Sequence, residues 1–193
     1  TPKAKEQENF TDPESRIMRD GATKGFVQDY NTQVAVNEDS QIIVAATLNS
    51  QASDSGQLVP VIEEVKETTG VYPSEALADA GYKSEANFAA LEDHPTEVYV
   101  ACGRESYDPR ATCPEEPLPE NATATERMDR KLKTGEGRAI YKKRKHLVEP
   151  VFGWIKQSLG FRQFSLRGQE NAEAEWKLVC GAMNLRRMAR MMG

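Results

Sequence analysis

Cysteine and histidine are scarce in this sequence of 193 residues, which contains three cysteines and two histidines. The odd, widely spaced cysteines exclude a disulfide framework and indicate a reducing compartment. Cys102 and Cys113 are too far apart to form a CxxC pair, and the isolated His94 does not supply a second pair of ligands. We therefore expect no zinc site.

Long apolar runs are also missing, which excludes a membrane-spanning helix and the apolar core of a secretory signal. Hydrophobic residues make up 38% of the chain and charged residues 28%, a balance typical of a folded globular protein. The length fits a single domain over residues 1–193. The chain begins with Thr1, so we expect it to be part of a longer protein.

Acidic residues are nearly absent from one segment of an otherwise acidic chain. Residues 1–127 contain 10 Lys and Arg against 24 Asp and Glu, whereas residues 128–167 contain 11 against three. Such a segment is either a solvated charged surface or a site for a polyanion. We favour the polyanion because the acids are missing rather than interleaved.

The order of predicted elements is that of an α/β protein. Three strands joined by hairpins precede alternating strands and helices, which predicts a mixed five-stranded sheet with helices on both faces. An irregular insertion is expected at about residues 102–137. Strands are predicted at 8–12, 26–36, 41–48, 75–79 and 97–101, and helices from 58 to about 69, from 84, over 137–159 and over 172–192.

Three aspartates lie where strands or helices are expected to end or begin. Asp79 closes a buried strand, so it either caps the following turn or binds a partner at the sheet edge. Asp12 precedes Pro13, where a turn-forming role is the simpler interpretation in isolation. Asp54 is interpreted as a helix cap.

Glu149 is the one acid among five cations within seven residues on either side, Lys142, Lys143, Arg144, Lys145 and Lys156. It is either a salt-bridged surface residue or a metal-binding carboxylate beside phosphate-binding cations. On a continuous helix, Lys145, Glu149 and Lys156 would share one face. Pro150 argues that the helix kinks or restarts at this point.

Four sequence blocks together resemble the bacterial insertion-sequence DDE transposases. They read Thr-Asp-Pro-Glu-Ser-Arg at 11–16, Gly-Phe-Val-Gln-Asp-Tyr-Asn-Thr-Gln at 25–33, Leu-Ala-Asp-Ala-Gly-Tyr at 77–82 and Val-Glu-Pro-Val-Phe-Gly-Trp-Ile-Lys at 148–156. The resemblance continues to Asn-Leu-Arg-Arg at 184–187. It covers nearly the whole chain, and the order of the blocks is more specific than any one of them.

The resemblance implies a ribonuclease H-like fold in which Asp12, Asp79 and Glu149 are catalytic and bind two Mg²⁺ ions, with Mn²⁺ as a substitute. It implies double-stranded DNA as the partner, at transposon ends and target, and a homodimer on that DNA. It also implies a cytoplasmic, nucleoid-associated protein whose DNA-binding region lies upstream. Lys142, Lys143, Arg144, Lys145 and Lys156 are the expected phosphate contacts.

The chain departs from the family at the Tyr-Arg-Glu-Lys signature around the glutamate. Glu149 and Lys156 keep the expected spacing, but Tyr141 and Arg144 are each displaced by one residue. Two alternatives therefore stay open. The chain is either a catalytically inactive, transposase-derived DNA-binding domain or a metal-dependent nuclease of the same fold without strand transfer.

Overall fold

The computed structural model describes residues 9–19, 24–103, 113 and 117–193. Within these ranges no helix is long and apolar enough to cross a bilayer. The elements, in chain order, are β1 (Arg16–Arg19), β2 (Phe26–Asp29), β3 (Asn31–Val36), β4 (Ile43–Asn49), η1 (Asp54–Gly56), α1 (Leu58–Thr69), β5 (Glu75–Ala78), η2 (Ala80–Tyr82), α2 (Glu85–Ala90), β6 (Glu97–Val100), α3 (Ala124–Lys133), α4 (Gly135–Lys142), η4 (Lys143–His146), α5 (Val148–Ser158) and α6 (Gln169–Met192).

The strands do not form the predicted five-stranded sheet. Within the described residues they pair only in twos: β1 with β2 and β3 with β4 are antiparallel, and β5 with β6 is parallel. The mixed α/β class is confirmed, as are the strands predicted near 75–79 and 97–101. The single continuous sheet is wrong, because within the described residues no strand of one pair is hydrogen-bonded to a strand of another.

The N-terminal strands differ most from the prediction. Residues 9–15 form turns, so the strand predicted at 8–12 is wrong over its described part. The strand predicted at 26–36 breaks at Tyr30, whose backbone N–H donates to the Asp29 carboxylate at 2.8 Å. This local hydrogen bond replaces a ladder bond and separates β2 from β3.

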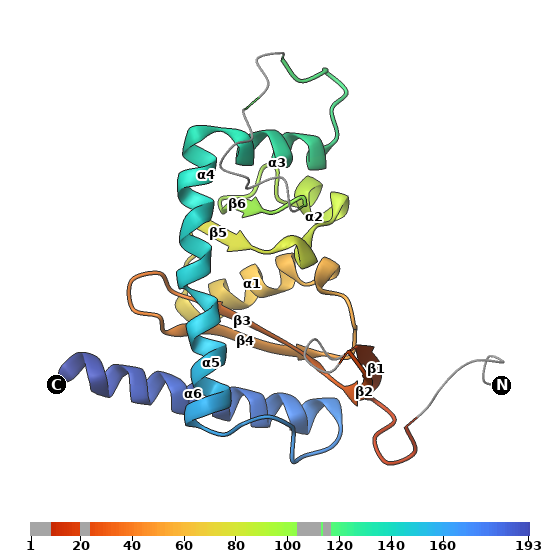
Figure 1. Ribbon diagram of the computed structural model, residues 1–193, viewed down its shortest axis with the longest axis vertical. Helices are drawn as coiled ribbons and strands as arrows, with labels where there is room; N and C mark the ends of the chain where they lie inside the picture. Colours follow the sequence, from red (N-terminus) through yellow and green to blue (C-terminus); the bar gives the residue numbers. More distant parts are fainter. Residues whose placement is uncertain (1–8, 20–23, 104–112, 114–116) are drawn as a thin grey trace.

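Helices cover both faces of the β3–β4 hairpin (Figure 1). Ala45 of β4 packs against Val61 and Val65 of α1 on one side. The largest core cluster lies on the other side, between the hairpin and the helices α5 and α6. Its buried members are Tyr30, Ile43, Leu48, Val151, Ile155, Ala172, Trp176, Cys180 and Met183. Trp154, Phe161 and Phe164 pack against this cluster, which agrees with their interpretation as core residues.

The parallel pair β5–β6 belongs to a second core, with α1, α2 and α3 around it (Figure 1). Helix α3 lies inside the stretch predicted to be an irregular insertion, so residues 124–133 are a correction to that prediction. Its N-terminus carries a capping box in which Thr123 and Glu126 exchange hydrogen bonds.

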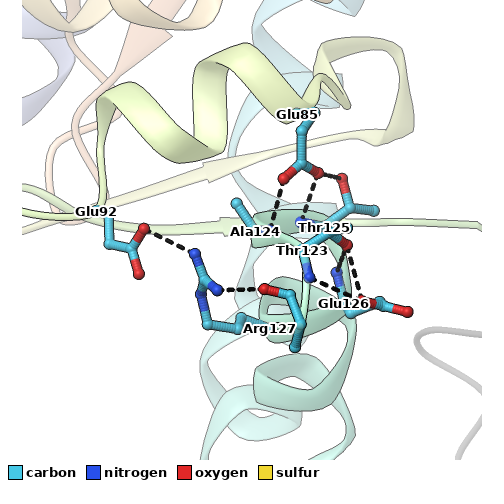
Figure 2. Close-up of polar contacts among 8 residues, drawn as sticks. Glu85, Glu92, Thr123, Ala124, Thr125, Glu126 and Arg127 are labelled. Carbon is cyan, nitrogen blue, oxygen red and sulfur yellow. Dashed lines mark hydrogen bonds and ion pairs between the residues drawn. The ribbon is translucent and has the colours of Figure 1, made fainter. Parts of the chain in front are cut away.

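Glu85 attaches α3 to α2, as Figure 2 shows. Its carboxylate accepts hydrogen bonds from the backbone N–H groups of Ala124 at 2.6 Å and Thr125 at 2.9 Å, and from the Thr125 hydroxyl. The Thr125 hydrogen bonds, first of all that of its hydroxyl, lower the pKa of Glu85. Arg127 adds an ion pair to Glu92 at 2.7 Å. These contacts fix where α3 begins, and α4 and η4 follow it directly.

The helix predicted over 137–159 is interrupted. Helix α4 ends at Lys142, a 3₁₀ turn follows, and α5 begins at Val148. Pro150 therefore lies in the first turn of α5, where its missing N–H costs no helical hydrogen bond. This confirms the restart rather than the kink, and the single continuous face from Lys145 to Lys156 is not formed.

Candidate functional site

A pocket of about 330 Å³ lies where the two parallel strands β5 and β6 end. Its lining comes from η1, the β5–η2 junction, the residues after β6, and the α4–η4 junction. The lining residues are Asp54, Asp79, Ala80, Gly81, Ala101, Gly103, Tyr141 and Arg144. Ligands bind outside the carboxyl ends of strands in open α/β sheets, and this pocket has that position.

Asp79 leaves β5 and points into the turn that follows. One of its carboxylate oxygens, Oδ1, accepts a hydrogen bond from the backbone N–H of Gly81 at 2.8 Å, so it caps η2. The capping interpretation is therefore correct for one oxygen. The residue remains exposed and lines the pocket, so the capping bond leaves Asp79 accessible to a ligand.

Asp54 comes from a distant part of the sequence and lies beside Asp79. A Cβ atom added to Gly81 would stand 2.9 Å from Oδ1 of Asp79 and 3.0 Å from Oδ2 of Asp54. The two carboxylate oxygens are therefore at most about 6 Å apart. The missing side chain of Gly81 keeps the space between them open.

Asp54 does not cap a helix, contrary to the sequence interpretation. The cap of η1 is Ser53, whose side chain accepts from the Ser55 N–H. Oδ1 of Asp54 instead accepts from Nδ2 of Asn31 at 2.7 Å and from Nε2 of Gln33 at 2.8 Å. Strand β3 thus fixes the orientation of this carboxylate.

Tyr82 completes the network behind Asp54. Its hydroxyl donates to Oε1 of Gln33, a residue only 2% exposed. Burial first, and then the negative charges of Asp54 and Asp79, raise the pKa of Tyr82. The phenol therefore stays protonated at neutral pH and keeps donating to Gln33.

Arg144 is the cation that lines the pocket. Its guanidinium stands 5.7 Å from the ring centroid of Tyr141, within cation–π range. Its Nε is buried and has no hydrogen-bond partner among the described residues. A buried donor without an acceptor is costly, so a hydrogen bond from this atom to an oxygen would be favourable.

Glu149 lies in the first turn of α5, exposed, and does not line the pocket. Lys156 is also exposed, on the same helix. Lys142 ends α4 in an exposed position, and Lys143 is paired with Glu38 at 3.2 Å. Lys145 belongs to η4; its side chain lies outside the described part of the structure.

Asp12 lies in the turn before β1 and is 9% exposed. Oδ1 accepts from the hydroxyl of Tyr30 at 2.7 Å and from the backbone N–H of Gly168 at 3.2 Å. Burial first, then this hydrogen bond, raise the pKa of Tyr30. Among the residues that the structure describes, no group of three or more His, Cys, Asp or Glu side chains is arranged to hold a metal ion. The structure thus brings Asp79 together with Asp54, and the triad of Asp12, Asp79 and Glu149 stays a prediction.

The comparisons with known proteins identify one family. Residues 98–189, slightly less than half of the chain, match the family model described as transposase DDE domain. The match includes Arg144, Glu149 and Lys156 and leaves Asp54 and Asp79 outside it. Neither a curated protein nor a solved structure matches the chain. The resemblance found in the sequence blocks is thereby confirmed over residues 98–189, where the chain is similar to the DDE transposases.

Proposed function

We propose that this chain is the catalytic domain of a DNA transposase. It would hydrolyse a phosphodiester at a transposon end and then join the freed 3′-hydroxyl to target DNA. The transposase DDE match over residues 98–189 carries this proposal. The pocket at the strand ends supports it, because Asp79 and Arg144 line that pocket together.

The donors at this pocket suit a hard divalent cation. Mg²⁺ and Mn²⁺ prefer carboxylate oxygen ligands, and Asp79 offers them at an exposed position beside a second carboxylate. Such a cation polarises a phosphoryl oxygen and lowers the pKa of bound water. Asp12 and Glu149 remain the other two residues that the family resemblance proposes, and each needs its own test.

Arg144 is placed to contact the phosphate group that reaches the pocket. A guanidinium binds phosphate oxygens with several fixed donors. Lys142 and Lys156 are exposed on the helices that flank η4 and are proposed to extend the phosphate contacts, with Lys143 and Lys145. DNA binding should therefore weaken as salt rises. Joining two transposon ends further predicts a homodimer on DNA.

The direct test uses supercoiled plasmid and a labelled duplex with a pre-cleaved 3′-hydroxyl end. With Mg²⁺ or Mn²⁺ we expect nicking of the plasmid and joining of the labelled end to it, and Asp79→Asn should abolish both. Cleavage that persists in Asp79→Asn would contradict the proposed metal site. Cleavage without joining would identify a nuclease of the same fold.

A second function has one observation in its favour. No three carboxylates converge among the described residues, which is the arrangement expected of a domain that binds DNA without cleaving it. In that case the wild-type protein would bind duplex DNA in a salt-dependent manner, and neither metal would elicit nicking. The same plasmid assay separates the two functions.

A further inference from the structure

We propose that Asp54 is a metal-binding carboxylate that shares a divalent cation with Asp79. This inference rests on the proposed metal-dependent function and adds to it a residue outside the triad of the resemblance. The geometry at Gly81 carries it, since the two carboxylates come from different elements and face the same gap.

The separation of the two oxygens fits a shared cation. Oxygen ligands bind Mg²⁺ at about 2.1 Å and Ca²⁺ at about 2.3–2.6 Å, so two ligands of one ion lie about 3–5 Å apart. Oδ1 of Asp79 and Oδ2 of Asp54 are at most about 6 Å apart, because both lie within 3.0 Å of one point. A small rotation of one side chain brings them within the reach of one ion.

Gly81 leaves room for that ion. The backbone of Gly81 does not have a positive φ, so the turn itself does not require glycine. A Cβ at this position would stand 2.9 Å from Oδ1 of Asp79 and 3.0 Å from Oδ2 of Asp54, so the carboxylates would have to shift to make room for it. The absence of a Cβ is therefore explained by the space between the two aspartates.

The hydrogen bonds of Asp54 are those of a pre-oriented ligand. Both amide donors, from Asn31 and Gln33, bind Oδ1, and Oδ2 is the oxygen that faces Gly81. Gln33 is itself held by Tyr82 and by Asn31, whose Oδ1 accepts from its Nε2 at 3.0 Å. Partners behind a ligand fix its orientation in metal sites, and this network does so for Asp54.

A purely structural role for Asp54 explains fewer of its contacts than metal binding does. Asp54 does not cap η1, where Ser53 does. No ion pair between Asp54 and Arg144 is formed within the described residues, although both line the pocket. Two neighbouring carboxylates repel each other without a cation between them. A cation bound between the two carboxylates would remove that repulsion and would be coordinated by Oδ2 of Asp54.

The test measures Mn²⁺ binding by electron paramagnetic resonance of the free ion, without DNA and without an activity readout. We expect Asp54→Asn and Asp79→Asn each to weaken Mn²⁺ affinity about 10–100-fold. The matched control Asp39→Asn, in an exposed turn outside the pocket, should leave it unchanged. Asparagine at position 54 keeps the acceptor for Asn31 and Gln33, so the melting temperature without metal should match that of the wild type. A structural role predicts the reverse: a lower melting temperature and unchanged Mn²⁺ affinity.

Gly81→Ala provides an independent variant that keeps both carboxylates. The added Cβ should fill the gap and weaken Mn²⁺ binding. Wild-type affinity in either Asp54→Asn or Gly81→Ala, with affinity lost in Asp79→Asn, would overturn the role of Asp54 and leave the proposed function standing. Absence of Mn²⁺ binding by the wild-type protein would overturn both.

Discussion

Asp12 and Asp79 are surrounded by opposite kinds of groups. Asp12 is buried among donors, the hydroxyl of Tyr30 and the N–H of Gly168, which both bind Oδ1. Asp79 is exposed, uses Oδ1 for the N–H of Gly81, and faces another acid across that glycine. A carboxylate surrounded by donors is stable as an anion without metal, whereas neighbouring carboxylates gain from a cation.

The surroundings of Asp12 explain what that residue does for the fold. Gly168 directly precedes α6, and the next N–H, that of Gln169, donates to Glu14 at 2.7 Å. Two carboxylates from the turn before β1 thus bind the N-terminus of α6, where unpaired N–H groups and the helix dipole favour negative charge. Asp12 ties the longest helix to the N-terminal turn.

The largest expected effect is on the rate of DNA cleavage when the two aspartates are substituted. Asp79→Asn should lower Mg²⁺-dependent cleavage by about 10²–10³-fold, because a metal stabilises the transition state by several kcal/mol and about 1.4 kcal/mol is a factor of ten. Asp12→Asn keeps an oxygen acceptor for Tyr30 and Gly168. Loss of cleavage in this folded variant would support Asp12 as a metal ligand, as the family resemblance proposes, and a wild-type rate would limit Asp12 to its role in the fold. The plasmid nicking assay measures both variants.

Substitution at Asp12 should lower the free energy of unfolding more than substitution at Asp79. Asp12→Ala leaves a buried hydroxyl and an N–H without their acceptor, so we expect it to lower the free energy of unfolding by about 1–3 kcal/mol. Asp79→Ala removes one turn hydrogen bond at an exposed position and should cost about 1 kcal/mol or less. Urea unfolding measures the difference. Equal losses at both positions would contradict the distinction between them.

A smaller effect concerns DNA contacts at the pocket and near Asp12. Arg144 lines the pocket, and Arg167 directly precedes Gly168, whose backbone N–H donates to Asp12. Arg144→Ala should reduce the slope of log affinity against log salt by about 0.9 and the affinity severalfold, whereas Arg167→Ala should change neither. Fluorescence anisotropy with a labelled duplex at several salt concentrations measures both. A larger effect at Arg167 would place the DNA near Asp12 rather than at the pocket.

The smallest effect concerns Glu85, which holds α3 and so positions η4. Its pKa is lowered from 4.5; its contribution to stability is therefore complete above that value and is lost as pH falls through the folded-state pKa. Glu85→Gln should have a lower melting temperature than the wild type at pH 7, and the gap should close towards pH 3. A gap that is constant with pH would show that charge is not involved.

Local signals in the sequence predicted much of the fold. Leu58, Val61, Ile62 and Val65 follow helical spacing, and all four are buried on α1. Helix α3 was missed although Thr123 and Glu126 carry the spacing of a capping box. The single sheet was wrong because strand pairing depends on long-range contacts that no local pattern contains.

The candidate site was predictable only in part, for the same reason. Asp79 was recognised from its place after a buried strand and from its sequence block. Asp54 was not, because its position depends on Asn31 and Gln33, more than 20 residues away in sequence. Only the folded chain brings these groups together, so a short motif cannot reveal them.

The hydrogen bonds of Glu85 also determine where the chain re-enters the fold after β6. The chain leaves β6 at Val100 and is captured again at Thr123 to Thr125. The start of α3, and with it the position of Arg144, is thereby set by hydrogen bonds to α2 rather than by the length of the segment that leads to it.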